Sequence, residues 1–309
     1  MKKTMRNATH VEGYLYEHDL KLRETGPNSK NPGTSFITGT VSIATNDAKD
    51  NIVPVHFTYT TEKTKSGSNN ATYGILKDII DGKIQSIMGH GEDNAAKLRI
   101  DSAIGLNEFY SDRNGTDELV SVKRNEGGFV HIVNQLNENE NKRNTFEADM
   151  LIIGTKRVEA DEERDLPEKL IVRGAIFDFR KAILPIEFSV LHPGAMDYFE
   201  GLEATSKNPT FTAVKGIQVS ETVVRRVEEE SAFGEASIRE TRSTRKDWVI
   251  TWAAKEEYAW DDEETLTAVE VQKAMTDRET YLATIKQRQD EYRAQRNAEQ
   301  APAAGGFNF

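Results

Sequence analysis

Two stretches of the sequence share one pattern. Residues 34–57 read TSFITGTVSIATNDAKDNIVPVHF, and residues 169–188 read KLIVRGAIFDFRKAILPIEF. Each has a glycine at the centre of an alternating apolar run, then a turn, then two aliphatic residues, proline, an aliphatic residue, one spacer and phenylalanine. Alternation with a period of two is typical of a half-buried strand, and a glycine inside a strand suits a sharp bend at a barrel corner. Each stretch therefore predicts two neighbouring strands.

Two landmarks further upstream agree with this repeat. Val11 and Phe146 stand 28 residues before Gly39 and Gly174, respectively, and each lies in a short segment of its own strand-like pattern. Chance similarity is the alternative, because strands draw on a limited set of valine, isoleucine, phenylalanine and glycine residues. We interpret the agreement as a tandem duplication of one small, mostly β domain.

The order of predicted elements indicates an OB-type barrel, because three strands, a short helix and two more strands match that five-stranded fold. In the first copy the predicted strands lie at 11–16, 37–43, 55–59, 98–109 and 119–133, the last folded as a hairpin over 125–128, with a helix at 71–80. In the second copy a stunted helix is predicted at 197–202, and strands at 211–224 and 237–253. The predicted fold class is mainly β, with two tandem OB-like five-stranded barrels plus a long C-terminal α-helix and a flexible tail.

Composition places the domain boundaries. Residues 134–144 are polar and rich in Asn and Glu, which is typical of a solvated connection. Acidic residues 261–264 open a helical pattern that carries one apolar stripe, suited either to packing on a barrel or to a coiled-coil partner. We predict a first barrel at 1–136, a linker at 137–144, a second barrel at 145–255, a helix at 256–297 and a flexible tail at 298–309.

Several classes of site are excluded by the residues present. The chain has no cysteine, which removes disulfides, thiolate metal sites and cysteine nucleophiles. Its six histidines are scattered, and phosphate-loop, dinucleotide-binding and serine-elbow motifs are absent. We therefore predict no enzymatic activity, no metal and no cofactor. There is no secretion signal and no apolar run of about 18 residues, so a cytoplasmic protein outside the membrane is expected.

Binding chemistry is better represented than catalysis. The net charge of −11 opposes a general attraction to nucleic acid, but the 40 Lys and Arg residues can still line one groove. Single-stranded nucleic acid needs aromatic faces for its bases and cations for its phosphates, and the two occur together here. The candidate DNA-binding residues are Lys63, Lys65, Lys123, Arg124, Phe129, Arg173, Phe177, Phe179, Arg180, Lys181, Arg239, Arg242, Arg245, Lys246, Trp248 and Trp252.

Burial is the alternative for several aromatic residues. Alternation puts Arg173, Phe177 and Phe179 on the outer face of their strand, but the two phenylalanines could instead pack beneath the C-terminal helix. Trp248 and Trp252 share one face, so at least one of them is expected to be buried. Polar alternating neighbours predict that three further aromatics belong to the cores: Phe57, Tyr59 and Phe188.

With these features together, the chain resembles single-stranded DNA-binding proteins of bacteriophage or mobile-element type. The resemblance covers residues 10–255 by pattern and extends to the terminal residues 305–309, which read GGFNF. It implies stoichiometric coating of single-stranded DNA in replication or recombination, with partner proteins recruited through Phe307 and Phe309. The chain departs from such proteins in lacking an acidic tip, since no Asp or Glu follows Glu299.

A viral structural or assembly protein is the alternative function. Duplicated β-barrels with a long helix could build subunit contacts, and the acidity and absent catalytic motifs fit this class equally well. A continuous exposed basic groove near Arg173, Phe177, Arg242 and Arg245 would favour DNA, whereas an apolar belt would favour assembly.

Overall fold

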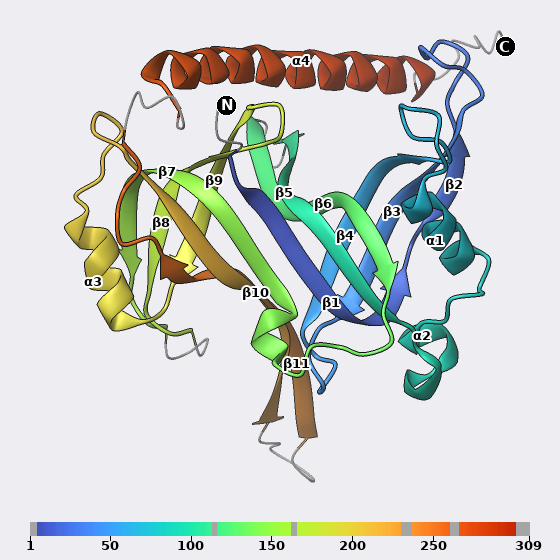
Figure 1. The fold of residues 1–309 in the computed structure, drawn as a ribbon, viewed down its shortest axis with the longest axis horizontal. Helices are drawn as coiled ribbons and strands as arrows, with labels where there is room; N and C mark the ends of the chain where they lie inside the picture. The colour runs from blue at the N-terminus through green and yellow to red at the C-terminus, as the bar shows by residue number, and fades with distance from the viewer. Residues whose placement is uncertain (1–4, 113–115, 162–165, 230–236, 260–265, 301–309) are drawn as a thin grey trace, which may run out of the picture.

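The computed structural model describes residues 5–112, 116–161, 166–229, 237–259 and 266–300, with side chains described for all of these except 112, 221–229, 237–245 and 297–300. The protein is mainly β, and its described strands join in a single sheet (Figure 1). The first half contains β1 (Asn7–His18), β2 (Lys21–Glu24), β3 (Ser35–Ala44), β4 (Ile52–Thr61), α1 (Ala71–Ile80), α2 (Ile87–His90), β5 (Lys97–Asp112) and β6 (Asp117–Ile132). The second half contains β7 (Asn144–Val158), β8 (Lys169–Phe177), β9 (Ile183–Val190), α3 (Pro193–Gly201), β10 (Thr210–Glu229), β11 (Ser237–Ala253) and α4 (Ala268–Gln300).

Five strands in each half close into a barrel with the same order. In the first half β1 pairs antiparallel with β3 and β5, β3 with β4, and β5 with β6, and a short parallel bridge between β4 and β6 closes the ring. In the second half β7 pairs antiparallel with β8 and β10, β8 with β9, and β10 with β11, and β9 and β11 close the ring in parallel. This is the order of an OB-type barrel, so the predicted fold class is confirmed.

Each barrel encloses its own apolar core. The first is built around Leu15, Val41, Phe57 and Leu98 and is capped by Leu76 and Ile79 of α1. The second is built around stacked Phe146 and Phe188, whose ring centroids are 4.6 Å apart. Phe57 and Phe188 are therefore core residues, as predicted from their polar alternating neighbours.

The strand glycine Gly174 shows why the quoted pattern needs glycine at its centre. A Cβ atom at this position would lie 2.1 Å from the carbonyl oxygen of Leu151 on the paired strand. Real Cβ atoms do not approach backbone so closely, so a side chain would push β8 away from β7.

Two predicted elements differ from the structure. Residues 125–128 do not form a hairpin: β6 runs straight through them, and Gly127 and Gly128 accommodate a β-bulge opposite β5. The C-terminal helix begins at Ala268 instead of residue 256. Tyr258 is held in an extended segment, because its amide donates to the Phe211 carbonyl and its hydroxyl to the Asp149 carboxylate. The acids predicted to open the helix lie outside the described residues. Residues 298–300 of the predicted tail belong to α4 instead, and the rest of that tail lies outside the described residues.

The barrels are joined by strand pairing and by a buried amide cluster. Residues 7–11 of β1 pair antiparallel with residues 144–148 of β7, which makes the two barrels one sheet. Beside this seam the side-chain amides of Asn125 and Gln218 donate to each other, at 2.7 and 3.0 Å. Asn144 donates to the Gln218 carbonyl at 2.5 Å, so the end of the predicted solvated linker is buried.

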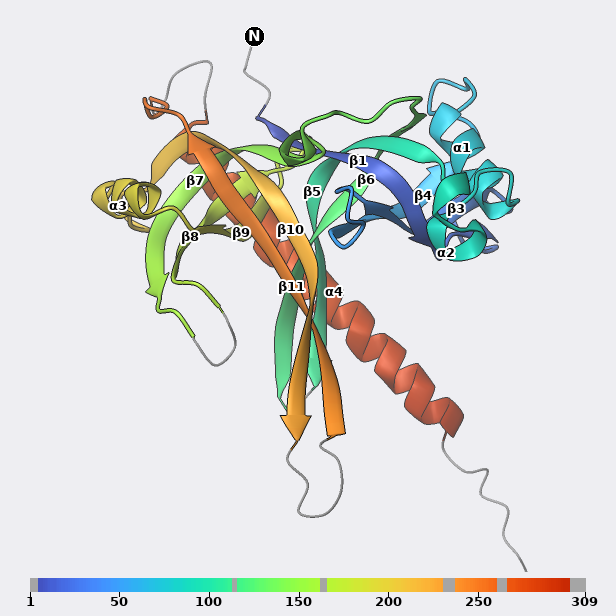
Figure 2. The same cartoon turned by 90° about the horizontal axis from the view of Figure 1, so that it is seen from below.

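Helix α4 lies across both barrels on one side, and the β10–β11 hairpin projects on the opposite side (Figure 1). Seen from below, β10 and β11 cross in front of α4 (Figure 2). The first turns of α4 pack through Val271 and Ala274 against a small apolar cluster that includes Phe177 of β8. The apolar stripe of the helix was predicted either to pack on a barrel or to bind a coiled-coil partner, and this contact agrees with packing on a barrel.

Replacing Gly174 by alanine tests whether close approach of the β7 backbone is the reason that this strand position holds glycine. We expect Gly174→Ala to lower the free energy of unfolding by about 3 kcal/mol, because the added methyl group meets backbone instead of a movable side chain. Gly201→Ala is the matched control, since a Cβ there has no atom within 4 Å, and it should change stability by less than about 0.5 kcal/mol. Urea unfolding followed by circular dichroism measures both, and equal midpoints for the two variants would contradict the steric argument.

Candidate nucleic-acid interface

Two aromatic side chains lie together on the outer face of the first barrel. Phe36 of β3 and Tyr59 of β4 have ring centroids 4.7 Å apart, and 52% of the Tyr59 side chain is exposed. These are the second and third strands of the barrel, the face that OB folds use for oligonucleotides and oligosaccharides. The pair is therefore an aromatic platform on the face where OB folds bind chains of this kind.

The prediction that Tyr59 is a core residue was wrong because of a register shift. Gly39 is opposite Phe57 whereas Ile37 is opposite Thr60, so β4 carries one extra residue at this point. A bulge of this kind ends the strict alternation of a strand. Phe57 still points into the core, and Tyr59 beyond it points outward.

Exposed cations border the aromatic platform. β2 pairs with β3 so that Arg23 is opposite Phe36 and Lys21 is opposite Thr38. Directly opposed residues share a face of the sheet, which puts both cations on the side of the Phe36 ring. Neither forms an ion pair with any residue that the structure describes. Lys63 and Lys65 are also exposed, in the loop that follows β4.

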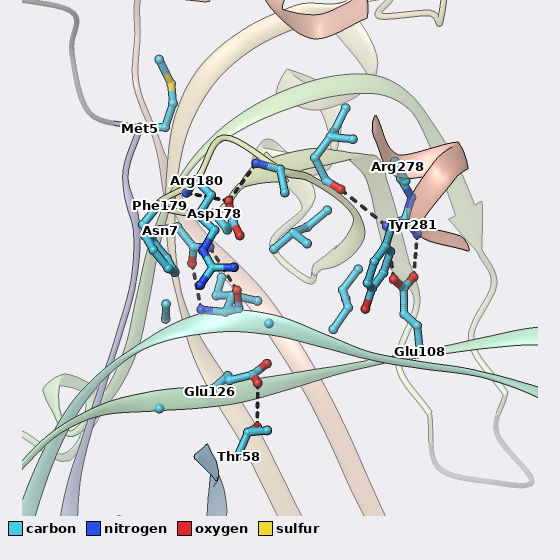
Figure 3. Close-up of a pocket in the computed structure, with 18 of the residues that line it drawn as sticks. Met5, Asn7, Thr58, Glu108, Glu126, Asp178, Phe179, Arg180, Arg278 and Tyr281 are labelled. Carbon is cyan, nitrogen blue, oxygen red and sulfur yellow. Dashed lines mark hydrogen bonds and ion pairs between the residues drawn. The ribbon is translucent and has the colours of Figure 1, made fainter. Parts of the chain in front are cut away.

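Tyr59 also lines a groove that opens between the first barrel, the β8–β9 turn and α4 (Figure 3). The groove has a volume of about 980 Å³. Phe179, 80% exposed, stands at its β8–β9 side with the Arg180 guanidinium 4.9 Å from its ring centroid. Tyr281 of α4 forms the opposite side. The groove thus combines three aromatic residues with a cation.

Four carboxylates line the groove, those of Glu108, Glu126, Asp178 and Asp277, and the first two are paired with arginine. The side chain of Glu108 is 2% exposed and bonds Arg278 of α4 at 2.5 Å, and Glu126 accepts from Arg124 at 3.0 Å. Charge pairing of this kind reduces the repulsion that an acidic groove wall would exert on phosphate.

The remaining sequence-predicted residues are scattered. Phe129 is exposed on β6, Lys246 is exposed on β11, and Arg173 is exposed opposite Glu187. Lys181 pairs with Glu270 of α4 at 3.1 Å. The structure brings Phe179 and Arg180 to the groove together with Tyr59, and Arg124 to its edge through Glu126.

The second barrel separates its two tryptophans. Trp248 packs against Phe146 and Phe188, whereas Trp252 is half-exposed with the Lys215 ammonium 5.3 Å from its ring centroid. Trp248 is therefore only partly buried against the core, and Trp252 lies outside, so neither tryptophan is fully buried as expected of at least one. Arg239, Arg242, Arg245, Phe307 and Phe309 have side chains outside the described residues.

Phe177 is corrected by the structure. Its side chain has no exposed surface and lies in the cluster beneath α4, with Ala274 and Leu266. The alternation of β8 is as predicted, but α4 covers this part of its outer face. Burial beneath the helix therefore holds for Phe177 and not for Phe179.

Lys123 lies between the barrels instead of on an open surface. Its ammonium donates to the Glu187 carbonyl and sits 5.4 Å from the Phe188 ring centroid. Burial lowers the pKa of this ammonium to about 8. In this conformation Lys123 contributes to the contact between barrels.

Phe36, Lys21, Arg23 and Tyr281 were not among the sequence candidates. A signal for Phe36 was present, because the buried face assigned to Ile37, Val41 and Ile43 leaves Phe36 on the outside. Nothing in the sequence indicates that β2 adds to β3. No group of three or more metal-binding side chains occurs among the described residues, and no helix there is long and apolar enough to cross a membrane.

The fold and this face define a protein with two OB-type barrels and an aromatic, basic surface on the first. The YorF family model matches residues 6–288, and the chain belongs to this family. No curated protein matches the sequence. Among solved structures, a deletion mutant of the single-stranded DNA binding protein from Thermus aquaticus is similar with a TM-score of 0.44 and 8% identity, over 84% of this chain and 99% of that one.

The pKa of Lys123 gives a pH-dependent test of its burial. Because the folded value of about 8 is below the reference of 10.5, the unfolded state binds more protons between these values. Wild-type stability should therefore rise relative to Lys123→Met from pH 8 to 10.5, by at most about 1.4 kcal/mol per pH unit. Chemical unfolding of both proteins across this range measures the difference, and parallel curves would contradict a buried ammonium.

Proposed function

We propose that the protein binds single-stranded DNA along the outer face of its first barrel and the adjoining groove. The observation that carries this proposal is the contact between Phe36 and Tyr59 on the second and third barrel strands, bordered by Lys21 and Arg23. Bases stack on aromatic rings whatever their sequence, and cations neutralise phosphates. Both groups line one path here.

The path continues from the platform into the groove. Tyr59 belongs to both, and beyond it lie Phe179 with Arg180 and, across the groove, Tyr281. A strand that follows this path would meet aromatic faces from both barrels and from α4. The overall negative charge of the protein then disfavours non-specific contacts elsewhere, so binding depends on this local surface.

We further propose that binding is stoichiometric and not catalytic, and that the protein serves DNA replication or recombination, including that of a bacteriophage. The second barrel would add contacts through Trp252 and Lys215, which already stand together. Phe307 and Phe309 are proposed to recruit replication or recombination proteins.

Alanine substitutions in the platform test the proposal. We expect Phe36→Ala and Tyr59→Ala each to weaken binding of fluorescent oligo-dT by about 1 to 3 kcal/mol, roughly 5- to 150-fold, because a stacking face is lost. Met88→Ala is the matched control, since Met88 is an exposed apolar residue on α2; it should leave affinity unchanged. Circular dichroism would verify that all three variants remain folded.

Salt dependence separates the cation contribution. Because each phosphate contact contributes about 0.7 to the slope of log affinity against log salt, Lys21→Gln with Arg23→Gln should reduce that slope by about 1.4. Fluorescence titration at several salt concentrations measures this. Salt-insensitive binding of micromolar strength or weaker, equal for duplex and single strand, would refute the proposed function. Tighter binding of oligo-U than of oligo-dT would refute DNA as the ligand.

A further inference from the structure

One stripe of α4 faces the first barrel across the groove. Arg278, Tyr281, Ile285 and Gln289 follow one another at steps of three or four residues, so they share one side of the helix. Two of them contact β5: Arg278 bonds Glu108, and the Gln289 side chain bonds both backbone groups of Tyr110.

Tyr281 lies between these two anchors on the same stripe, yet half of its side chain is exposed. A residue on the inward side of a packed helix is normally buried. Here the tyrosine ring faces the groove instead of a packed core (Figure 3). α4 is therefore a second wall of the groove and not a lid that fills it.

The two ends of α4 are held differently. Its first turns pack by apolar side chains on the cluster around Phe177. Its far half is held by polar contacts: Gln289 to Tyr110, and Arg293 to Asp117 of β6 at 2.6 Å. The Lys286 ammonium also lies 5.8 Å from the Tyr110 ring centroid. Polar contacts of this kind at the surface or partly buried contribute only about 0.5 to 1.5 kcal/mol each, so this half can separate from the barrel without disturbing either core.

We propose that a single strand of DNA passes between α4 and the first barrel, with Tyr281 stacking on a base, so that the protein encloses the strand. This inference rests on the proposed function and adds to it a helix that acts as a clasp. Enclosure would favour a flexible single strand over a duplex. It also means that DNA enters either by its free end or when the far half of α4 lifts.

A covalent cross-link between the far half of α4 and β6 tests whether the strand passes beneath the helix. The chain has no cysteine, so Asp117→Cys with Arg293→Cys supplies the only two thiols, which a reducible bismaleimide would join. We expect the cross-linked protein to bind linear oligo-dT within about threefold of the unlinked variant, since a free end can thread. Binding to a covalently circularised oligo-dT of the same length should fall at least about tenfold and return when the linker is reduced.

Each outcome separates this inference from the proposed function. If the unlinked variant fails to bind linear oligo-dT, the proposed function fails. If the cross-linked protein binds linear and circular DNA equally, the strand does not pass beneath α4; if it loses both, α4 must leave for binding. Either result overturns the clasp. The control joins Lys77→Cys to Asp81→Cys within α1, which should affect neither form of DNA.

A second measurement addresses Tyr281 directly. Tyr281→Ala should weaken linear oligo-dT binding about tenfold, whereas Tyr281→Phe, which keeps the stacking face, should bind as the wild type does. Equal affinities for all three proteins would remove Tyr281 from the site.

Discussion

The reciprocal amide contact between Asn125 and Gln218 fixes how the two barrels meet. Each side chain donates to the other in a buried site, and the surrounding amides of Asn51 and Asn144 bond the Gln218 carbonyl. Such polar groups are satisfied only in one geometry, so any rotation of one barrel against the other would leave a buried donor or acceptor unpaired. The groove depends on this, because its walls come from both halves of the chain.

Local pairing of charge explains how an acidic protein can present an aromatic surface bordered by unpaired cations. Arg278 and Arg124 each hold a carboxylate of the groove, whereas Lys21 and Arg23 border the platform without an acidic partner in the described chain. Net charge describes the average of the surface and not this face.

The strand glycines and the barrel order were predictable because they follow from local rules of alternation and backbone space. Gly174 and the phenylalanines of the two cores illustrate this. Tyr59 could not be placed correctly, since one extra residue in β4 reverses its direction and no residue type marks that bulge. The burial of Phe177 depends on where the distant helix α4 packs. The exposure of Tyr281 depends on the groove that lies between that helix and the first barrel. Contacts between distant segments therefore decided most of the candidate site.

The pairing of β1 with β7 couples the unfolding of the two barrels. Residues 9–11 of β1 pair with β5 of their own barrel on one side and with β7 of the other barrel on the other side, so the two barrels share one hydrogen-bonded sheet. If either barrel melted alone, the survivor would present an unpaired strand edge, which is a template for aggregation. Selection for solubility should therefore keep the two barrels on one polypeptide and make them unfold together.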